Sequence, residues 1–178
     1  MFNRKKFIII VRILLSIMII ANMAVIFAFS AENGEESGKR SDGVIESLAG
    51  LIIKNYDNLT ADEKENITSI LATPVRKAAH MIEYAALSFL CSALVYTFTE
   101  KVVLNISIPI IFSFLYAMTD ELIHQRMTAG RAGQFTDVCI DTVGAAMGTM
   151  FFLFIASLIK KRINLACLKS SNSENRKY

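Results

Sequence analysis

The sequence predicts an all-α integral membrane protein, a bundle of four transmembrane helices with the N- and C-termini in the cytoplasm. Three observations predict it: 53% of the 178 residues are hydrophobic, four long apolar runs follow one another, and basic residues flank the first and last runs. A membrane-spanning helix needs about 20 apolar residues. In lipid every backbone N–H and C=O needs a partner within its own segment, so the spans should be helical. The net charge of +3 gives no reason to expect a nucleic-acid partner.

The N-terminal segment, residues 1–30, is predicted to be a transmembrane anchor. Its apolar run from Phe7 to Ser30 is interrupted only by Arg12 and is preceded by the basic residues Arg4 to Lys6. Residues 28–31 resemble a small-residue cleavage site, so the alternative is a signal peptide. The run is longer than the apolar region of a usual signal peptide, and we therefore favour an uncleaved anchor.

Residues 31–75 are predicted to form an extracytoplasmic linker and amphipathic segment. The polar stretch from Glu32 to Gly43 contains Gly and Ser and is expected to be the linker. Short amphipathic helices should follow, because apolar side chains recur at helical spacing from Val44 to Ile52 and a capping box of Thr60 and Glu63 begins a second helix. Such helices can lie on the membrane surface or pack on the ends of the spans, and the pattern leaves both open.

The remaining spans belong to a predicted three-helix transmembrane domain, residues 76–162, followed by a cytoplasmic basic tail, residues 163–178. Its apolar runs are Ala78 to Thr99, Val102 to Thr119 and Val138 to Ile159. Pro109 lies inside the second of these runs and should kink that helix or loosen its hydrogen bonding.

Basic residues set the predicted orientation in the cell membrane. Arg4 to Lys6 precede the first span and Lys160 to Arg162 follow the last one, which places both ends in the cytoplasm. The segment before the second span and the loop 120–137 are then extracytoplasmic. Arg76 and Lys77 fall on the side that basic residues avoid, and a functional role would account for this.

Polar and charged side chains gather near the extracytoplasmic ends of the last three spans. Charged groups in a span are costly, so each is a candidate for function. His80 and Glu83 share a helix face, and Asp137 and Asp141 are one turn apart. A structural ion-pair network between helices is the alternative to a ligand-binding site. The candidate ligand-binding residues are Lys77, His80, Glu83, Asp120, Glu121, Gln125, Arg131, Asp137 and Asp141.

Gly144 and Gly148 form a G-x-x-x-G pattern in the last span. Small residues at this spacing let two helices approach closely. We interpret the pattern as packing within the bundle rather than as dimerisation. The oligomeric state is left open by the sequence.

Four segments of the last three spans form a recognisable pattern. They are Lys77-Ala-Ala-His80-Met-Ile-Glu83-Tyr84, Asp120-Glu121-Leu-Ile-His-Gln125, Gly130-Arg131 and Asp137-Val-Cys-Ile-Asp141-Thr142-Val-Gly144. Together these segments resemble the VanZ-like family of bacterial membrane proteins, which is associated with resistance to glycopeptides of the teicoplanin type. They cover about residues 75–160 and not the first span. The resemblance departs from the expected pattern in the position of Gln125 relative to the acidic pair, and in Ala129, where a Pro is expected before Gly-Arg. It implies a cell-envelope membrane protein and no particular reaction.

Two classes of function follow, and the sequence leaves open whether the protein is an enzyme. The favoured one is an envelope factor that binds a membrane lipid or a lipid-linked cell-wall precursor in a polar pocket at the outer face. Arg131 and Lys77 would meet the phosphate, since a guanidinium binds it in bidentate fashion.

The alternative is a membrane-embedded hydrolase acting on a lipid-linked or peptide-like envelope substrate. Its catalytic candidates are His80, Glu83 and Asp141, with the imidazole as general base or acid. Carboxylates and histidine could instead hold a divalent metal that activates water. No known catalytic motif occurs in the sequence. A transporter has less support, because the polar residues stop near one face.

Overall fold

The structure is a computed structural model that describes residues 4–32, 34–121 and 134–174, and within them every regular element is helical. Four helices of these residues are long and apolar enough to cross a membrane, and they comprise Arg4–Ser30, Ala61–Tyr96, Val102–Thr119 and Phe135–Ala166. This confirms the predicted class, an all-α membrane protein with four spans. In chain order the elements are α1 (Arg4–Ser30), α2 (Gly34–Ile52), the short 3-10 helix η1 (Tyr56–Asn58), α3 (Ala61–Tyr96), α4 (Val102–Thr119) and α5 (Phe135–Glu174).

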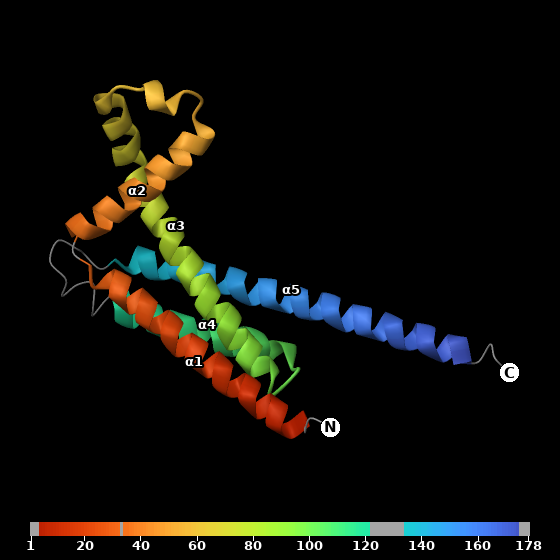
Figure 1. Cartoon of the computed structure of the whole chain (residues 1–178). Helices are drawn as coiled ribbons and strands as arrows, with labels where there is room; N and C mark the ends of the chain where they lie inside the picture. The colour runs from red at the N-terminus through yellow and green to blue at the C-terminus, as the bar shows by residue number, and fades with distance from the viewer. Residues whose placement is uncertain (1–3, 33, 122–133, 175–178) are drawn as a thin grey trace.

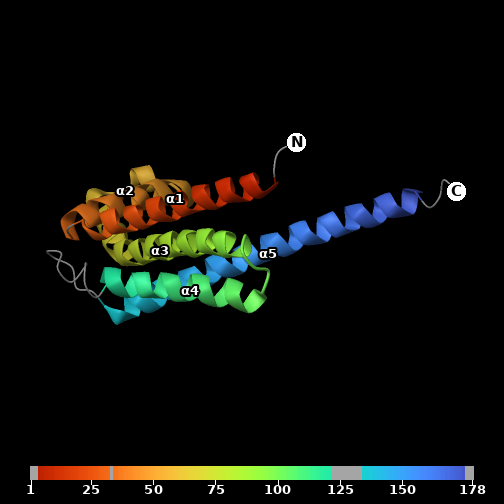
Figure 2. The ribbon, with the colours of Figure 1, turned by 90° about the horizontal axis from the view of Figure 1, so that it is seen from below.

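Helix α3 is the central element, because it contacts each of the other four α-helices. One side of the bundle holds the last turns of α1 and α4 and the first turn of α5. We call this side the Ser30 end. The start of α1 and the last turns of α5 lie toward the opposite end (Figure 1, Figure 2). The first helix thus begins, and the last helix ends, on the same side of the bundle, as an even number of spans requires. The assignment of that side to the cytoplasm stays a prediction from the basic residues.

The expected linker at residues 32–43 is wrong, because α2 already begins at Gly34. Two contacts account for a helix in so polar a stretch. Ile45 and Ala49 are buried in the packing of α2 against α3. Arg40 forms an ion pair with Glu32 and lies over the ring of Phe29, 4.0 Å from its centroid. Tertiary packing therefore overrides the weak local preference for helix.

The second amphipathic helix and the second span form one continuous helix, α3, and not two elements. The predicted capping box is confirmed: the Thr60 N–H donates to Glu63 Oε2 at 2.9 Å, and the Glu63 N–H donates to Thr60 Oγ1 at 3.3 Å. With 36 residues, α3 is about 54 Å long, which exceeds the ~30 Å hydrocarbon core. Its first part thus projects beyond the Ser30 end and carries α2 (Figure 1). The helices α3 and α4 continue through Pro74 and Pro109.

Helix α1 lies at the edge of the bundle and is held at two levels. Near its start, Arg12 Nε donates to Thr97 Oγ1 at 3.0 Å and Nη2 donates to the Thr97 carbonyl at 2.7 Å. The same guanidinium lies 3.6 Å from the ring centroid of Phe98. Further along, the Tyr116 hydroxyl donates to the Met23 carbonyl at 2.8 Å. The one charge inside the first apolar run is therefore a structural contact to the α3–α4 turn.

The two glycines of the G-x-x-x-G pattern lie against the backbone of α3. A Cβ at Gly144 would lie 2.2 Å from the Met81 carbonyl oxygen, and one at Gly148 would lie 2.0 Å from that of Ala85. Only glycine permits this approach, so the pattern serves packing within the bundle, as predicted.

Helix α5 is longer than the predicted span. The apolar run ends at Ile159, but the helix continues to Glu174 and extends past the other helices (Figure 2). No Gly or Pro occurs between residues 160 and 174 to end it. Most of the predicted basic tail is therefore a helical extension of the fourth span.

Candidate functional site

The predicted site residues that the structure describes lie toward the Ser30 end, in three groups on different sides of α3. Gln125 and Arg131 lie outside the described residues. The first group is a set of buried carboxylates from α5 and the end of α4. The second is an ion pair between α3 and α5. The third lines a pocket between α1, α2 and α3.

The buried carboxylates are Asp120, Glu121 and Asp141, each at most 3% exposed. Asp120 and Glu121 follow α4 in a π-helical turn, a rare element that often marks functional sites. Asp120 Oδ2 accepts a hydrogen bond from the Ser30 hydroxyl at 2.5 Å, which ties the end of α1 to the end of α4. All three carboxylates lie within electrostatic range of the fully buried Tyr84 of α3.

This group brings carboxyl groups together inside the bundle. Asp141 has Glu121, Asp120, Asp137 and also Glu83 of the third group within electrostatic range, and ionised neighbours of this kind repel unless protons or cations offset them. Asp141 Oδ2 and the Tyr84 hydroxyl find no hydrogen-bond partner within the described part of the chain. No group of three or more His, Cys, Asp or Glu side chains in that part is placed to hold a metal ion. The sequence left a divalent metal possible, and these residues contain no such group to hold one.

Lys77 and Asp137 form the second group. Lys77 Nζ donates to Asp137 Oδ1 at 2.6 Å, and both side chains are partly exposed. The pair joins α3 to the first turn of α5, where a carboxylate also meets the positive end of the helix dipole. Lys77, predicted as a phosphate ligand, is thus engaged with a carboxylate in this structure.

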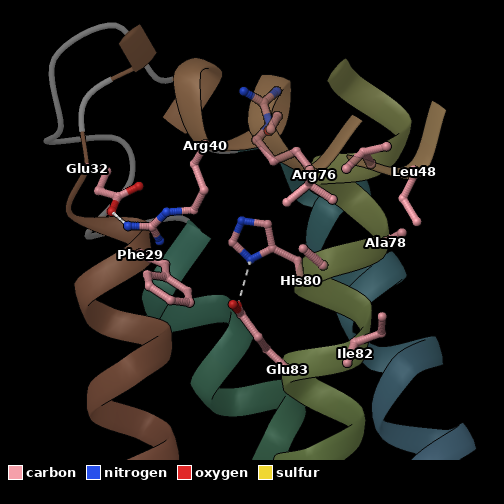
Figure 3. Close-up of a pocket in the computed structure, with 13 residues that line it drawn as sticks. Phe29, Glu32, Arg40, Leu48, Arg76, Ala78, His80, Ile82 and Glu83 are labelled. Atoms are coloured by element: carbon pink, nitrogen blue, oxygen red, sulfur yellow. Dashed lines mark hydrogen bonds and ion pairs between the residues drawn. The ribbon is translucent and has the colours of Figure 1, made fainter. Parts of the chain in front are cut away.

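His80 and Glu83 form the third group, on the side of α3 that faces α1 and α2. His80 Nδ1 lies 3.7 Å from Glu83 Oε2, and the two side chains are 14% and 16% exposed (Figure 3). They line a pocket of about 280 Å³. The other residues that line it are Phe29, Glu32, Arg40, Ser41, Val44, Leu48, Val75, Arg76, Ala78, Ala79 and Ile82.

Arg40 and Arg76 add two guanidinium groups to this pocket, and neither was predicted as a site residue. Arg40 lies at the pocket edge between Glu32 and Phe29, whereas Arg76 reaches over the rim (Figure 3). Arg76 forms no hydrogen bond or ion pair with any residue that the structure describes. Arg76 could have been predicted as a site residue, because it lies on the side of the membrane that basic residues avoid. No such signal existed for Arg40, because its segment was expected to be a linker.

The pocket combines charged groups of both signs with apolar walls. Its lining is mainly apolar and includes Phe29, Val44 and Ile82, and its charged groups are the guanidiniums of Arg40 and Arg76 and the carboxylates of Glu32 and Glu83. Because Glu32 pairs with Arg40, Arg76 is the cation without an acidic partner in the described part of the chain. Guanidinium groups suit phosphate and carboxylate, and apolar walls suit hydrocarbon. Such a pocket can bind an anionic amphiphile.

A family model described as VanZ/LLP1 matches residues 15–157. The match begins inside α1 and ends inside α5, so it includes the second half of the first span and all of α2, which the motifs of the last three spans did not cover. None of the curated proteins and none of the solved structures matches the chain.

Proposed function

Because the chain belongs to the VanZ/LLP1 family, we propose that it is a multi-pass protein of the cell membrane that contributes to resistance against teicoplanin-type glycopeptides. Its role is to bind an anionic lipid or a lipid-linked cell-wall precursor at the Ser30 end. We place that end on the extracytoplasmic side, because Arg4 to Lys6 and Lys160 to Arg162 lie at the other end.

The pocket between α1, α2 and α3 carries this proposal. Arg76 has no acidic partner in the described part of the chain, so its guanidinium is available to an anion. Arg40 is held near by Glu32 and Phe29. An oxyanion that meets both groups would gain charge-assisted hydrogen bonds.

The walls of the pocket define the rest of the ligand. Ile82 and Glu83 lie about two turns further into the span than Arg76. A phosphate near Arg76 therefore leaves an attached chain next to Ala79 and Ile82. This arrangement matches the amphiphilic order of a membrane lipid, head group outward and hydrocarbon inward. Holding a lipid-linked precursor in this way would limit its capture by a glycopeptide.

Expression in a glycopeptide-sensitive host tests the proposal. Arg76→Gln removes the available guanidinium and should restore teicoplanin sensitivity without lowering the amount of protein in the membrane. Lys160→Gln is the matched control, because this cation is exposed, lies at the opposite end and pairs with Glu100. If Arg76→Gln keeps full resistance at a normal protein level, the pocket does not serve resistance.

A membrane-embedded hydrolase is the second candidate, and the contact between His80 and Glu83 favours it. A carboxylate beside an imidazole can orient it as a general base. Ser41 supplies the one hydroxyl among the residues that line the pocket. Asp141, the third catalytic candidate, does not line it. Incubation of the purified protein with a lipid-linked precursor separates the candidates: hydrolysis lost in Glu83→Gln supports the enzyme, and binding without any product supports the envelope factor.

A further inference from the structure

Helix α2 keeps one apolar flank exposed although its other apolar face is packed. Leu51 and Ile52 are 84% and 78% exposed, and Val44 and Leu48 are each 45% exposed. Val44, Leu48 and Leu51 are spaced by four and three residues, so they form one stripe along the helix. A contiguous exposed apolar stripe marks a surface that contacts a partner or a membrane.

The other sides of α2 are accounted for. Ile45 and Ala49 face α3 and are buried. The flank opposite the stripe is polar, with Lys39 and Glu46 exposed to solvent. The helix thus has a packed face, an apolar flank and a polar flank, which is the pattern of a helix at the boundary between water and lipid.

The pocket shows which way the apolar flank faces. Val44 and Leu48 line it together with Phe29, at the end of α1, and Ile82, inside the span of α3. In Figure 3 α2 lies across the top of the pocket, while Ile82 and Glu83 lie at its lower edge. The apolar flank therefore faces the membrane-spanning part of the bundle, and the polar flank faces away from it.

Exposed apolar side chains of two spans occur at this level of the molecule. Phe27 in the last turn of α1 is exposed, and Ile82 on α3 is 68% exposed. Both belong to helices able to cross a membrane, so we expect these side chains to meet hydrocarbon. Helix α2 crosses α3 near the Ser30 end (Figure 1), and its Val44 and Leu48 line the same pocket as Ile82. Arg40 and Lys54 lie near the two ends of the stripe, where cations meet lipid phosphates.

We propose that the apolar flank of α2 is a membrane-docking surface, seated in the lipid leaflet at the Ser30 end. The pocket roofed by α2 then opens sideways into this leaflet. The sideways opening of the pocket rests on the proposed function and deepens it, because it names the lipid leaflet as the source of the anionic ligand. The docking itself does not depend on any ligand.

Tryptophan fluorescence tests the docking, because the chain contains no Trp. Leu51→Trp places a single reporter on the stripe, and Val44→Trp is a second variant in case the first does not fold. Glu46→Trp on the polar flank is the control, and Ile20→Trp on the exposed side of α1 is the reference in lipid. Each full-length variant is reconstituted without ligand into phosphatidylcholine–phosphatidylglycerol vesicles, with or without brominated acyl chains.

We expect brominated lipid to quench Leu51→Trp and Val44→Trp nearly as strongly as Ile20→Trp, with a blue-shifted emission maximum, and Glu46→Trp only weakly. Quenching of the stripe reporters by aqueous iodide instead would overturn docking. Protection from both quenchers would also overturn it, since a protein partner or a second copy would then cover the stripe. Loss of resistance in Arg76→Gln is measured separately, so failure of the docking and failure of the proposed function can be told apart.

Discussion

Gly148 of α5 lies so close to α3 that a Cβ on it would be 2.0 Å from the carbonyl oxygen of Ala85. One turn earlier, Gly144 has the same relation to Met81. Beyond the glycines, the hydroxyls of Ser88 and Thr149 are 2.6 Å apart and fully buried. This seam joins the central helix to the longest helix of the bundle. The seam fixes α5 against α3, and it thereby positions two carboxyl residues of α5, Asp137 and Asp141.

The close approach predicts that Gly148→Ala destabilises the protein. The added methyl would meet backbone rather than a flexible side chain, so the helices must separate. We expect a loss of about 1–3 kcal/mol, the usual cost of overpacking. The measurement is the unfolding midpoint in detergent. Gly50→Ala is the control: nothing lies within 4 Å of a Cβ there, and Ala in a helix should stabilise by about 0.5–1 kcal/mol. Equal stability of the two variants would contradict the assigned packing.

Arg12→Lys should weaken the attachment of α1 although it keeps the charge. Lysine cannot reproduce the two directed hydrogen bonds to Thr97 together with stacking on Phe98. We expect a loss of about 1–2 kcal/mol, as for one or two hydrogen bonds. Unfolding of the variant in detergent measures this loss of stability, and Arg12→Gln, which also removes the charge, should lose more. Wild-type stability in Arg12→Lys would mean that only the charge matters.

Lys77 and Asp137 should be coupled more strongly than Lys160 and Glu100. Both pairs have a 2.6 Å contact, but the first has side chains 33% and 26% exposed and the second 60% and 64%. Solvent screens the second pair, so its coupling should be close to zero, against about 0.5–1 kcal/mol for the first. Double-mutant cycles with Lys→Met and with Asp→Asn or Glu→Gln measure both. Equal coupling energies would show that burial does not set the strength of the first pair.

The sequence predicted the four spans because their apolar runs are long and the membrane leaves helix as the only solution. It failed at residues 34–43, whose helix depends on packing of Ile45 and Ala49 against a segment distant in the chain. The site was only partly predictable for a similar reason. Lys77 and His80 are three residues apart, yet Lys77 meets α5 while His80 faces the pocket beside α2. Because the central helix has neighbours on several sides, residues that sequence spacing places close together on it can contact different helices.

Asp141→Asn should separate stability from function at the buried carboxylates. Asp141 lies among like charges and its Oδ2 has no hydrogen-bond partner in the described part of the chain. A neutral amide of the same shape removes repulsion, so we expect equal or greater stability, by up to about 1 kcal/mol, since replacing buried charges is often neutral or stabilising. Teicoplanin resistance should fall if the protein uses this charge. Unfolding in detergent and the teicoplanin susceptibility of expressing cells are measured on the same variant. Asp137→Asn is the comparison variant, because it breaks the ion pair with Lys77. A clear loss of stability in Asp141→Asn would show instead that the carboxylate is required to hold the helices together, and that its charge is offset within the bundle.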